Sequence, residues 1–191
     1  MNAVKPSLGD RYAEISVILL TILALAAGWW LMDGVQNRSL PYEAAGLTAQ
    51  VPAGWIQTAP SGETLLEARD RSSAGGFQTT YLVSKMLLTA DSGINETISL
   101  ITLQRGQELT AYRLLDQQRI QMAGREGVQL TYVYVESNPN ITHLETPVVV
   151  RGEDFVFFTV DGAVIVSYRA AGENFERGLA RFYRFLESVQ Y

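Results

Sequence analysis

The chain has 191 residues, no cysteine and a formal net charge of −5. The lack of cysteine excludes disulfide bonds, cysteine-ligated zinc or iron–sulfur clusters, thiol catalysis and covalent c-type haem. Residues 1–39 carry equal numbers of acidic and basic side chains, so residues 40–191 hold the whole negative excess. An acidic domain repels phosphate backbones, and we therefore expect no nucleic-acid partner.

Residues 15–32 form a long uncharged stretch between Glu14 and Asp33. As an α-helix this stretch would rise about 27 Å, close to the ~30 Å hydrocarbon core of a bilayer. Trp29 and Trp30 lie at one end of it, where aromatic rings favour the headgroup region. We predict a transmembrane helix over residues 15–32.

Two other interpretations of this stretch stay open. Ala24-Leu25-Ala26 matches the small-x-small pattern of a signal-peptide cleavage site, although the apolar run exceeds the usual ~7–15 residues. A helix buried in a soluble core is the other interpretation, but only Ser16 and Thr21 interrupt the apolar character of the stretch.

The charges that flank the stretch predict its orientation. Lys5 and Arg11 precede it, whereas Arg38 is the only basic residue shortly after it. Basic residues favour the cytoplasmic side, so residues 1–14 are expected to be a short cytoplasmic N-terminus. The domain that follows is expected outside the cytoplasmic (inner) membrane, in the periplasm or another extracytoplasmic space.

Small side chains on the predicted span would let another helix approach closely. The candidate contacts for a partner subunit are Ala24, Ala27 and Gly28, together with Trp29 and Trp30. The alternative is a helix that faces only lipid. The expected partners are therefore the lipid bilayer and other membrane-protein subunits.

Residues 33–40 are interpreted as a short polar tether, and residues 41–191 as a folded domain. Alternating apolar and polar residues, bounded by turn residues, predict strands at 46–51, 64–70 and 77–88 and one on each side of 123–127. The spacing of Ile94, Ile98 and Ile101 predicts a helix within 92–109.

The run "DFVFFTVDGAVIVSYRA" predicts a hairpin with Asp161 and Gly162 in the turn. That turn would pair Val160 with Ala163 and Phe158 with Ile165. Both faces of the hairpin are apolar, so we expect it in the middle of a sheet that is covered on each side.

The chain ends in a predicted amphipathic helix with apolar residues at helical spacing: Phe175, Leu179, Phe182, Leu186 and Val189. Arg177, Arg181 and Arg184 line another side of this helix. A solvated face explains this arginine stripe, and contact with lipid headgroups or an acidic partner is the alternative.

No catalytic constellation is evident in the sequence. His143 is the only histidine and lies in a loop without companions at a spacing useful for catalysis or metal binding. Arg151, Glu153 and Asp154 are expected in a turn at the start of a strand. We therefore expect no enzyme activity and no catalytic, cofactor-binding or metal-binding residue.

Three segments of residues 41–191 carry a resemblance to a known family: "YEAAGLTAQVPAGWIQ", "FVFFTVDGAVIVSYRA" and "FLESVQ". They follow one another in the order seen in PsbP-like domains, which residues 41–191 resemble. The resemblance implies an α+β fold in which helices flank an antiparallel sheet. The name-giving members are extrinsic subunits on the lumenal side of photosystem II. No ion-ligand motif of that family can be carried over to this chain.

These observations lead to one hypothesis and two alternatives. The chain is expected to be a non-catalytic, single-pass accessory subunit of a multi-subunit membrane complex that serves photosynthetic or respiratory electron transfer. A free-standing, membrane-anchored envelope module that binds a ligand or an exported client is the first alternative. An envelope hydrolase that uses His143 is the second.

Overall fold

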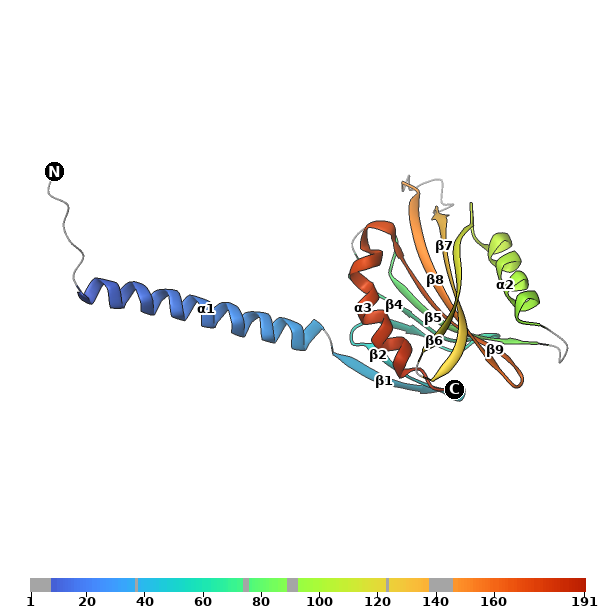
Figure 1. Cartoon of the computed structure of the whole chain (residues 1–191), viewed down its shortest axis with the longest axis horizontal. Coiled ribbons are helices and arrows are strands. Elements are labelled where there is room, and N and C mark those ends of the chain that lie inside the picture. Colours follow the sequence, from blue (N-terminus) through green and yellow to red (C-terminus); the bar gives the residue numbers. More distant parts are fainter. Residues whose placement is uncertain (1–7, 37, 74–75, 89–92, 123, 138–145) are drawn as a thin grey trace. The chain divides into compact units, whose positions relative to one another are not determined.

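The computed structural model describes the chain except for residues 1–7, 37, 74–75, 89–92, 123 and 138–145. In the first helix, the side chains at 8–15, 31, 33, 35 and 36 also lie outside the description. The chain divides into two compact units, Met1–Arg38 and Ser39–Tyr191 (Figure 1).

Helix α1 (Leu8–Gln36) makes up the first unit. Its described large apolar side chains are all exposed: Val17, Ile18, Leu19, Leu20, Ile22, Leu23, Leu25, Trp29, Trp30 and Met32. Within the residues that the structure describes, no helix combines the length and the apolarity needed to cross a membrane. The transmembrane span at 15–32 therefore stays a prediction.

The second unit is built on an antiparallel sheet. Its strand order is β3-β4-β5-β9-β8-β7-β6 in the described residues. The strands are β3 (Ile56–Thr58), β4 (Thr64–Arg69), β5 (Thr80–Leu87), β6 (Arg113–Met122), β7 (Arg125–Glu136), β8 (Val148–Thr159) and β9 (Gly162–Ala171). The α+β class and the antiparallel sheet predicted from the sequence are confirmed.

A helix packs on each face of this sheet, and Figure 1 shows the two on opposite sides of it. Helix α3 (Gly172–Ser188) buries Phe175, Phe182, Phe185 and Leu186 in the larger core. Helix α2 (Ile94–Glu108) buries Ile98 and Ile101 in a smaller core on the other face. The predictions of both helices from their apolar spacing are confirmed.

A separate hairpin, β1 (Ser39–Ala44) and β2 (Leu47–Pro52), packs against the end of α3. Ala45 and Gly46 form its turn with φ of 52° and 77°, so the strand predicted to start at Gly46 begins one residue later. The backbone N–H of Gln50 donates to Ser188 Oγ at 2.8 Å, which ties β2 to the helix.

The register predicted for the β8–β9 hairpin is wrong. Thr159 pairs with Gly162 and Phe158 with Ala163, so Val160 and Asp161 occupy the turn. A Cβ at Gly162 would overlap the carbonyl oxygen of Met86 on β5, so the glycine serves a close strand contact instead of the turn. The difference is two residues, which leaves every side chain on its predicted face. The central position of the hairpin is confirmed.

The turn predicted at Arg151, Glu153 and Asp154 is also wrong. All three residues lie inside β8, which pairs with β7 on one side and β9 on the other. Glu153 and Asp154 are 4% and 0% exposed. Polar residues in a short window favour a turn, but here Arg105 and Arg169, from other elements, compensate the buried charge of Asp154, which a local pattern cannot reveal.

Candidate functional site

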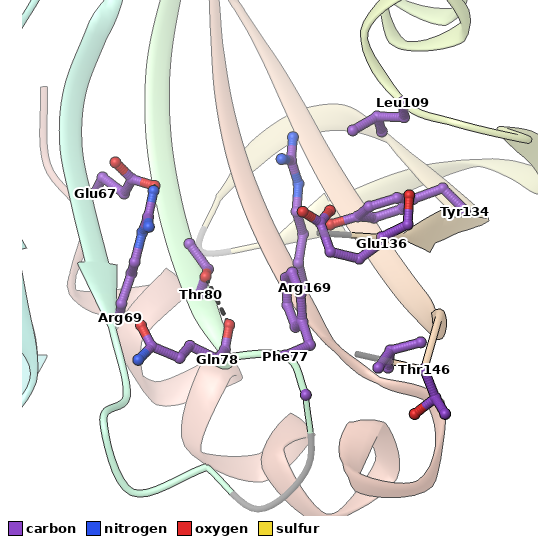
Figure 2. A pocket seen from close by; sticks show the side chains of 13 residues that line it. Glu67, Arg69, Phe77, Gln78, Thr80, Leu109, Tyr134, Glu136, Thr146 and Arg169 are labelled. Atoms are coloured by element: carbon purple, nitrogen blue, oxygen red, sulfur yellow. Dashed lines mark hydrogen bonds and ion pairs between the residues drawn. The ribbon is translucent and has the colours of Figure 1, made fainter. Parts of the chain in front are cut away.

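A hollow of about 470 Å³ opens on the α2 face of the sheet, beyond the part that α2 covers. Figure 2 shows its polar lining, with Glu67 and Arg69 from β4 on one side, Arg169 from β9 in the middle, and Tyr134 and Glu136 from β7 on the other side. These strands are neighbours or near neighbours in the sheet, which explains how residues distant in sequence meet.

A buried polar network lies beside this hollow. Arg105 Nε on α2 donates to Asp154 Oδ2 at 3.1 Å, and the Tyr132 hydroxyl donates to Asp154 Oδ1 at 2.9 Å. Arg169 Nε in turn donates to the Tyr132 hydroxyl oxygen at 3.1 Å. The network joins α2, β7, β8 and β9, so it holds the helix and the lining arginine in fixed positions.

The electrostatics of the network keep Asp154 and its two arginines ionised. Burial alone would raise the pKa of the Asp154 carboxyl, but Arg105 and Arg169 outweigh it and hold that pKa below its usual value. Burial raises the pKa of the Tyr132 phenol, so Tyr132 stays a neutral donor. The network therefore contains two guanidinium cations and one carboxylate anion.

Arg169 retains unused hydrogen-bonding capacity. Its Nη2 is buried and has no hydrogen-bond partner among the described residues. Burial would lower the pKa of its guanidinium, yet Tyr132 and Asp154 hold that pKa above the usual value. A buried, charged donor without an acceptor is costly, and a bound acceptor would remove that cost.

The other polar groups of the hollow are of two kinds. Arg69 Nη2 contacts Glu67 Oε1 at 2.6 Å, so these two charges compensate each other. Tyr134 lies beside Arg169, and burial raises the pKa of its phenol to about 12. Glu136 is exposed at the end of β7.

The residues predicted from the sequence to contact partners lie elsewhere. Ala24, Ala27, Gly28, Trp29 and Trp30 are exposed on α1, and a Cβ added at Gly28 would meet no atom within 4 Å. On α3, Arg177 and Arg184 are exposed and Arg181 is partly buried. The structure brings none of these residues into the hollow, and their contact with a partner stays a prediction.

His143 lies outside the described residues, so its proposed loop position stays a prediction. In the part of the chain that is described, no group of three or more histidine or acidic side chains is arranged to hold a metal ion.

Sequence reasoning missed the buried network, although one signal pointed to it. Arg105 continues the apolar stripe of α2 formed by Ile94, Ile98 and Ile101, because it follows them at helical spacing. A charged residue on a buried stripe needs a buried partner. The identity of that partner could not be read from the sequence, because Asp154 lies 49 residues away.

No protein-family model and no curated protein matches the chain. Solved structures do match it. Cyanobacterial PsbP (CyanoP) from Synechocystis sp. PCC 6803 aligns at 12% identity with a TM-score of 0.56, covering 81% of this chain and 92% of that one. LpqN of Mycobacterium tuberculosis, described as involved in cell envelope biogenesis, aligns at 13% identity with a TM-score of 0.53, covering 83% and 95%.

A protein of unknown function from Pseudomonas aeruginosa, PA94, also aligns, at 10% identity and a TM-score of 0.51, covering 81% of this chain and 97% of that one. At such identities the likeness concerns the fold alone. The chain has a PsbP-like fold, as the resemblance in the sequence implied.

Proposed function

We propose that this chain is a non-catalytic, single-pass accessory subunit of a multi-subunit membrane complex. Helix α1 spans the cytoplasmic membrane and the PsbP-like domain docks on partner subunits outside it. By analogy with the name-giving PsbP subunits, the complex serves photosynthetic or respiratory electron transfer.

The observation that carries the proposal is the exposure of α1 on all sides. Val17, Ile18, Leu19 and Leu20 are consecutive and 57–69% exposed. Successive residues of an α-helix are turned by about 100°, so these four side chains point around the whole helix. A helix that is apolar all round needs an apolar environment on every side, which lipid and partner helices supply.

Two further features support the membrane placement and the docking role. Lys5 and Arg11 before the span favour a cytoplasmic N-terminus, which sends the domain to the other side. Ala24 and Gly28 lie one above the other on α1, and their small side chains let an approaching helix come close to the backbone there.

A non-catalytic role agrees with the lining of the hollow. Among its described residues, Glu67 is engaged by Arg69, and no histidine or cysteine is present to activate a nucleophile.

Co-purification tests the proposal. The tagged full chain is extracted from native membranes in a mild non-ionic detergent, and associated proteins are quantified by mass spectrometry. We expect partners at fixed stoichiometry with the wild type, and their loss when Ala24→Leu and Gly28→Leu block close helix approach. Ala26→Leu makes the same change as Ala24→Leu on the opposite side of α1 and should retain the partners. Absence of stoichiometric partners from the wild type would refute the proposal.

The second candidate function is a membrane-anchored envelope module that binds a ligand. The hollow of about 470 Å³ favours it, because small-molecule sites commonly have volumes of roughly 300–1,000 Å³.

A further inference from the structure

We propose that the hollow on the α2 face binds a small organic anion, whose single carboxylate or phosphate group is held by Arg169. The inference deepens the second candidate function and rests on it. It does not require that the chain be part of a complex.

The charge balance of the buried network favours an anion. Arg105 and Arg169 are both cationic, and Asp154 is the anion that lies between them. Arg105 also contacts Glu108 at 3.4 Å, but that carboxylate is 47% exposed and is screened by solvent. Within the buried network one positive charge is therefore compensated only by exposed carboxylates, Glu108 and Glu136, and a desolvated anionic group beside Arg169 would balance it better.

The hydrogen bonding of Arg169 points to the same class of ligand. Its Nε is used by Tyr132 and its guanidinium also interacts with the Tyr134 hydroxyl, whereas its Nη2 is buried without an acceptor. A planar guanidinium fork matches the oxygens of carboxylate or phosphate, so a ligand oxygen that reaches Nη2 would satisfy this donor. The hydrogen bond from Nε to Tyr132 already restrains the side chain, so little entropy is lost on binding.

The apolar residues of the lining indicate what the uncharged part of the ligand is. Phe77, Leu109 and Val148 give the hollow apolar surface, and the Phe77 ring meets the Tyr134 ring edge-on with centroids 6.3 Å apart. This surface fits a short hydrocarbon or a single aromatic ring.

The carboxylates of the lining set a limit on charge. Glu67 is paired with Arg69, but Glu136 is exposed at the end of β7 without a resolved ion pair among the described residues. A second anionic group on the ligand would meet Glu136, so ligands with several anionic groups are disfavoured. The site therefore fits a small organic molecule with one anionic group better than a polyphosphate.

Calorimetric titration of the purified full chain in a non-ionic detergent tests the inference. The probes are benzoate, phenyl phosphate, inorganic phosphate and the neutral analogue benzamide. We expect saturable binding of benzoate or phenyl phosphate, and the probe that binds more tightly identifies the anionic group. Benzamide should bind at least about tenfold more weakly than benzoate. Inorganic phosphate lacks the apolar body and should bind more weakly than phenyl phosphate.

Variants identify the residue responsible. Arg169→Gln should weaken binding about tenfold or more, and Arg169→Lys should recover part of the loss, because it keeps the charge without the fork. Arg113→Gln removes an exposed arginine from β6, outside the lining of the hollow, and should bind as the wild type does. Equal binding by folded Arg169→Gln and wild type would overturn the inference.

A measurement on the wild type covers the case in which Arg169→Gln does not fold. With ¹³C-labelled tyrosine rings, benzoate should shift the signals of Tyr134, which lines the hollow, and leave those of Tyr42 on β1 unchanged. No shift at Tyr134 with saturating probe, or no binding of any anionic probe, would also overturn it. Because these titrations use the isolated chain, their outcome is independent of the co-purification result.

Discussion

Glu153 and Asp154 are adjacent in the sequence and carry opposite pKa shifts. Neighbouring strand residues point to opposite faces, so Glu153 faces α3 and Asp154 faces α2. Burial raises the pKa of Glu153, whose Oε2 lacks a hydrogen-bond partner, and Arg151 only partly offsets this. Asp154 has two arginines nearby, which outweigh its burial and lower its pKa. The neighbourhood, not the residue type, sets the cost of each charge.

The two carboxylates should therefore respond oppositely to neutralisation. Asp154→Asn should lower the free energy of unfolding at pH 7 by about 3 kcal/mol, because it leaves buried arginines uncompensated. Glu153→Gln should raise it by about 1 kcal/mol, because it removes a poorly satisfied buried charge. Urea unfolding of the full chain in detergent, followed by circular dichroism, measures both.

The pH dependence checks the cause of each effect. The folded-state pKa of Asp154 lies below its unfolded value, so its stabilisation is present above about pH 4 and is lost as the pH falls through that value and the lower folded pKa. The pKa of Glu153 is raised, so its destabilisation appears as the pH rises above about 4.5 through the folded pKa. Changes of the same sign in both variants would contradict this account.

At this level the sequence predicted a turn at the two carboxylates, so it predicted neither their place in a strand nor their opposite orientations. It could not predict their burial, because the compensating Arg105 and Arg169 come from α2 and β9. Local patterns report the chain neighbours of a residue, whereas its electrostatics depend on spatial neighbours.

Helix α3 packs closely on β9 because one of its residues has no side chain. A Cβ at Gly178 would overlap the hydroxyl of Tyr168, which donates to the carbonyl oxygen of Phe175 at 2.9 Å. The helix, the buried phenol and the larger core thus share one close contact. Gly106 on α2 is different, since the nearest atom to an added Cβ there is Tyr112 Cδ1 at 3.9 Å.

The two helix glycines make a matched pair. Gly106→Ala should raise the free energy of unfolding by up to about 1 kcal/mol, because alanine has the higher helix propensity. Gly178→Ala has the same gain in helix propensity, but it should lower the free energy of unfolding by about 1–2 kcal/mol, because the added methyl group would clash with the Tyr168 hydroxyl. Tyr168→Phe should restore part of that loss in the double variant. Similar stabilisation by both alanines would show that α3 is not held at this contact.

The helices and most strands could be predicted, because a period of 3.6 or 2 in apolar residues repeats over many positions. Turns could not be placed with equal accuracy. Asp161-Gly162 has the composition of a two-residue turn, but the approach of Met86 from β5 decided where Gly162 lies. A neighbouring strand that is distant in sequence outweighed the local turn preference.

At the level of the whole chain, the order of the strands in the sheet could not be predicted from the sequence. Strand β9 lies between β8, its hairpin partner, and β5, which precedes it by some eighty residues. The resemblance of quoted segments to PsbP-like domains implied the architecture, and the solved structures of cyanobacterial PsbP and LpqN support that fold. The hollow depends on this order, because β4, β5, β9 and β7 all contribute to its lining.

The central claim is that the chain works as a subunit held in a membrane complex by α1 and its domain. Native gel electrophoresis of membranes extracted in a gentle detergent, with mass spectrometry of the band that contains this chain, tests it most directly. The account predicts migration in a large assembly together with partner subunits at fixed stoichiometry. Migration as a single chain in its own detergent micelle would contradict it.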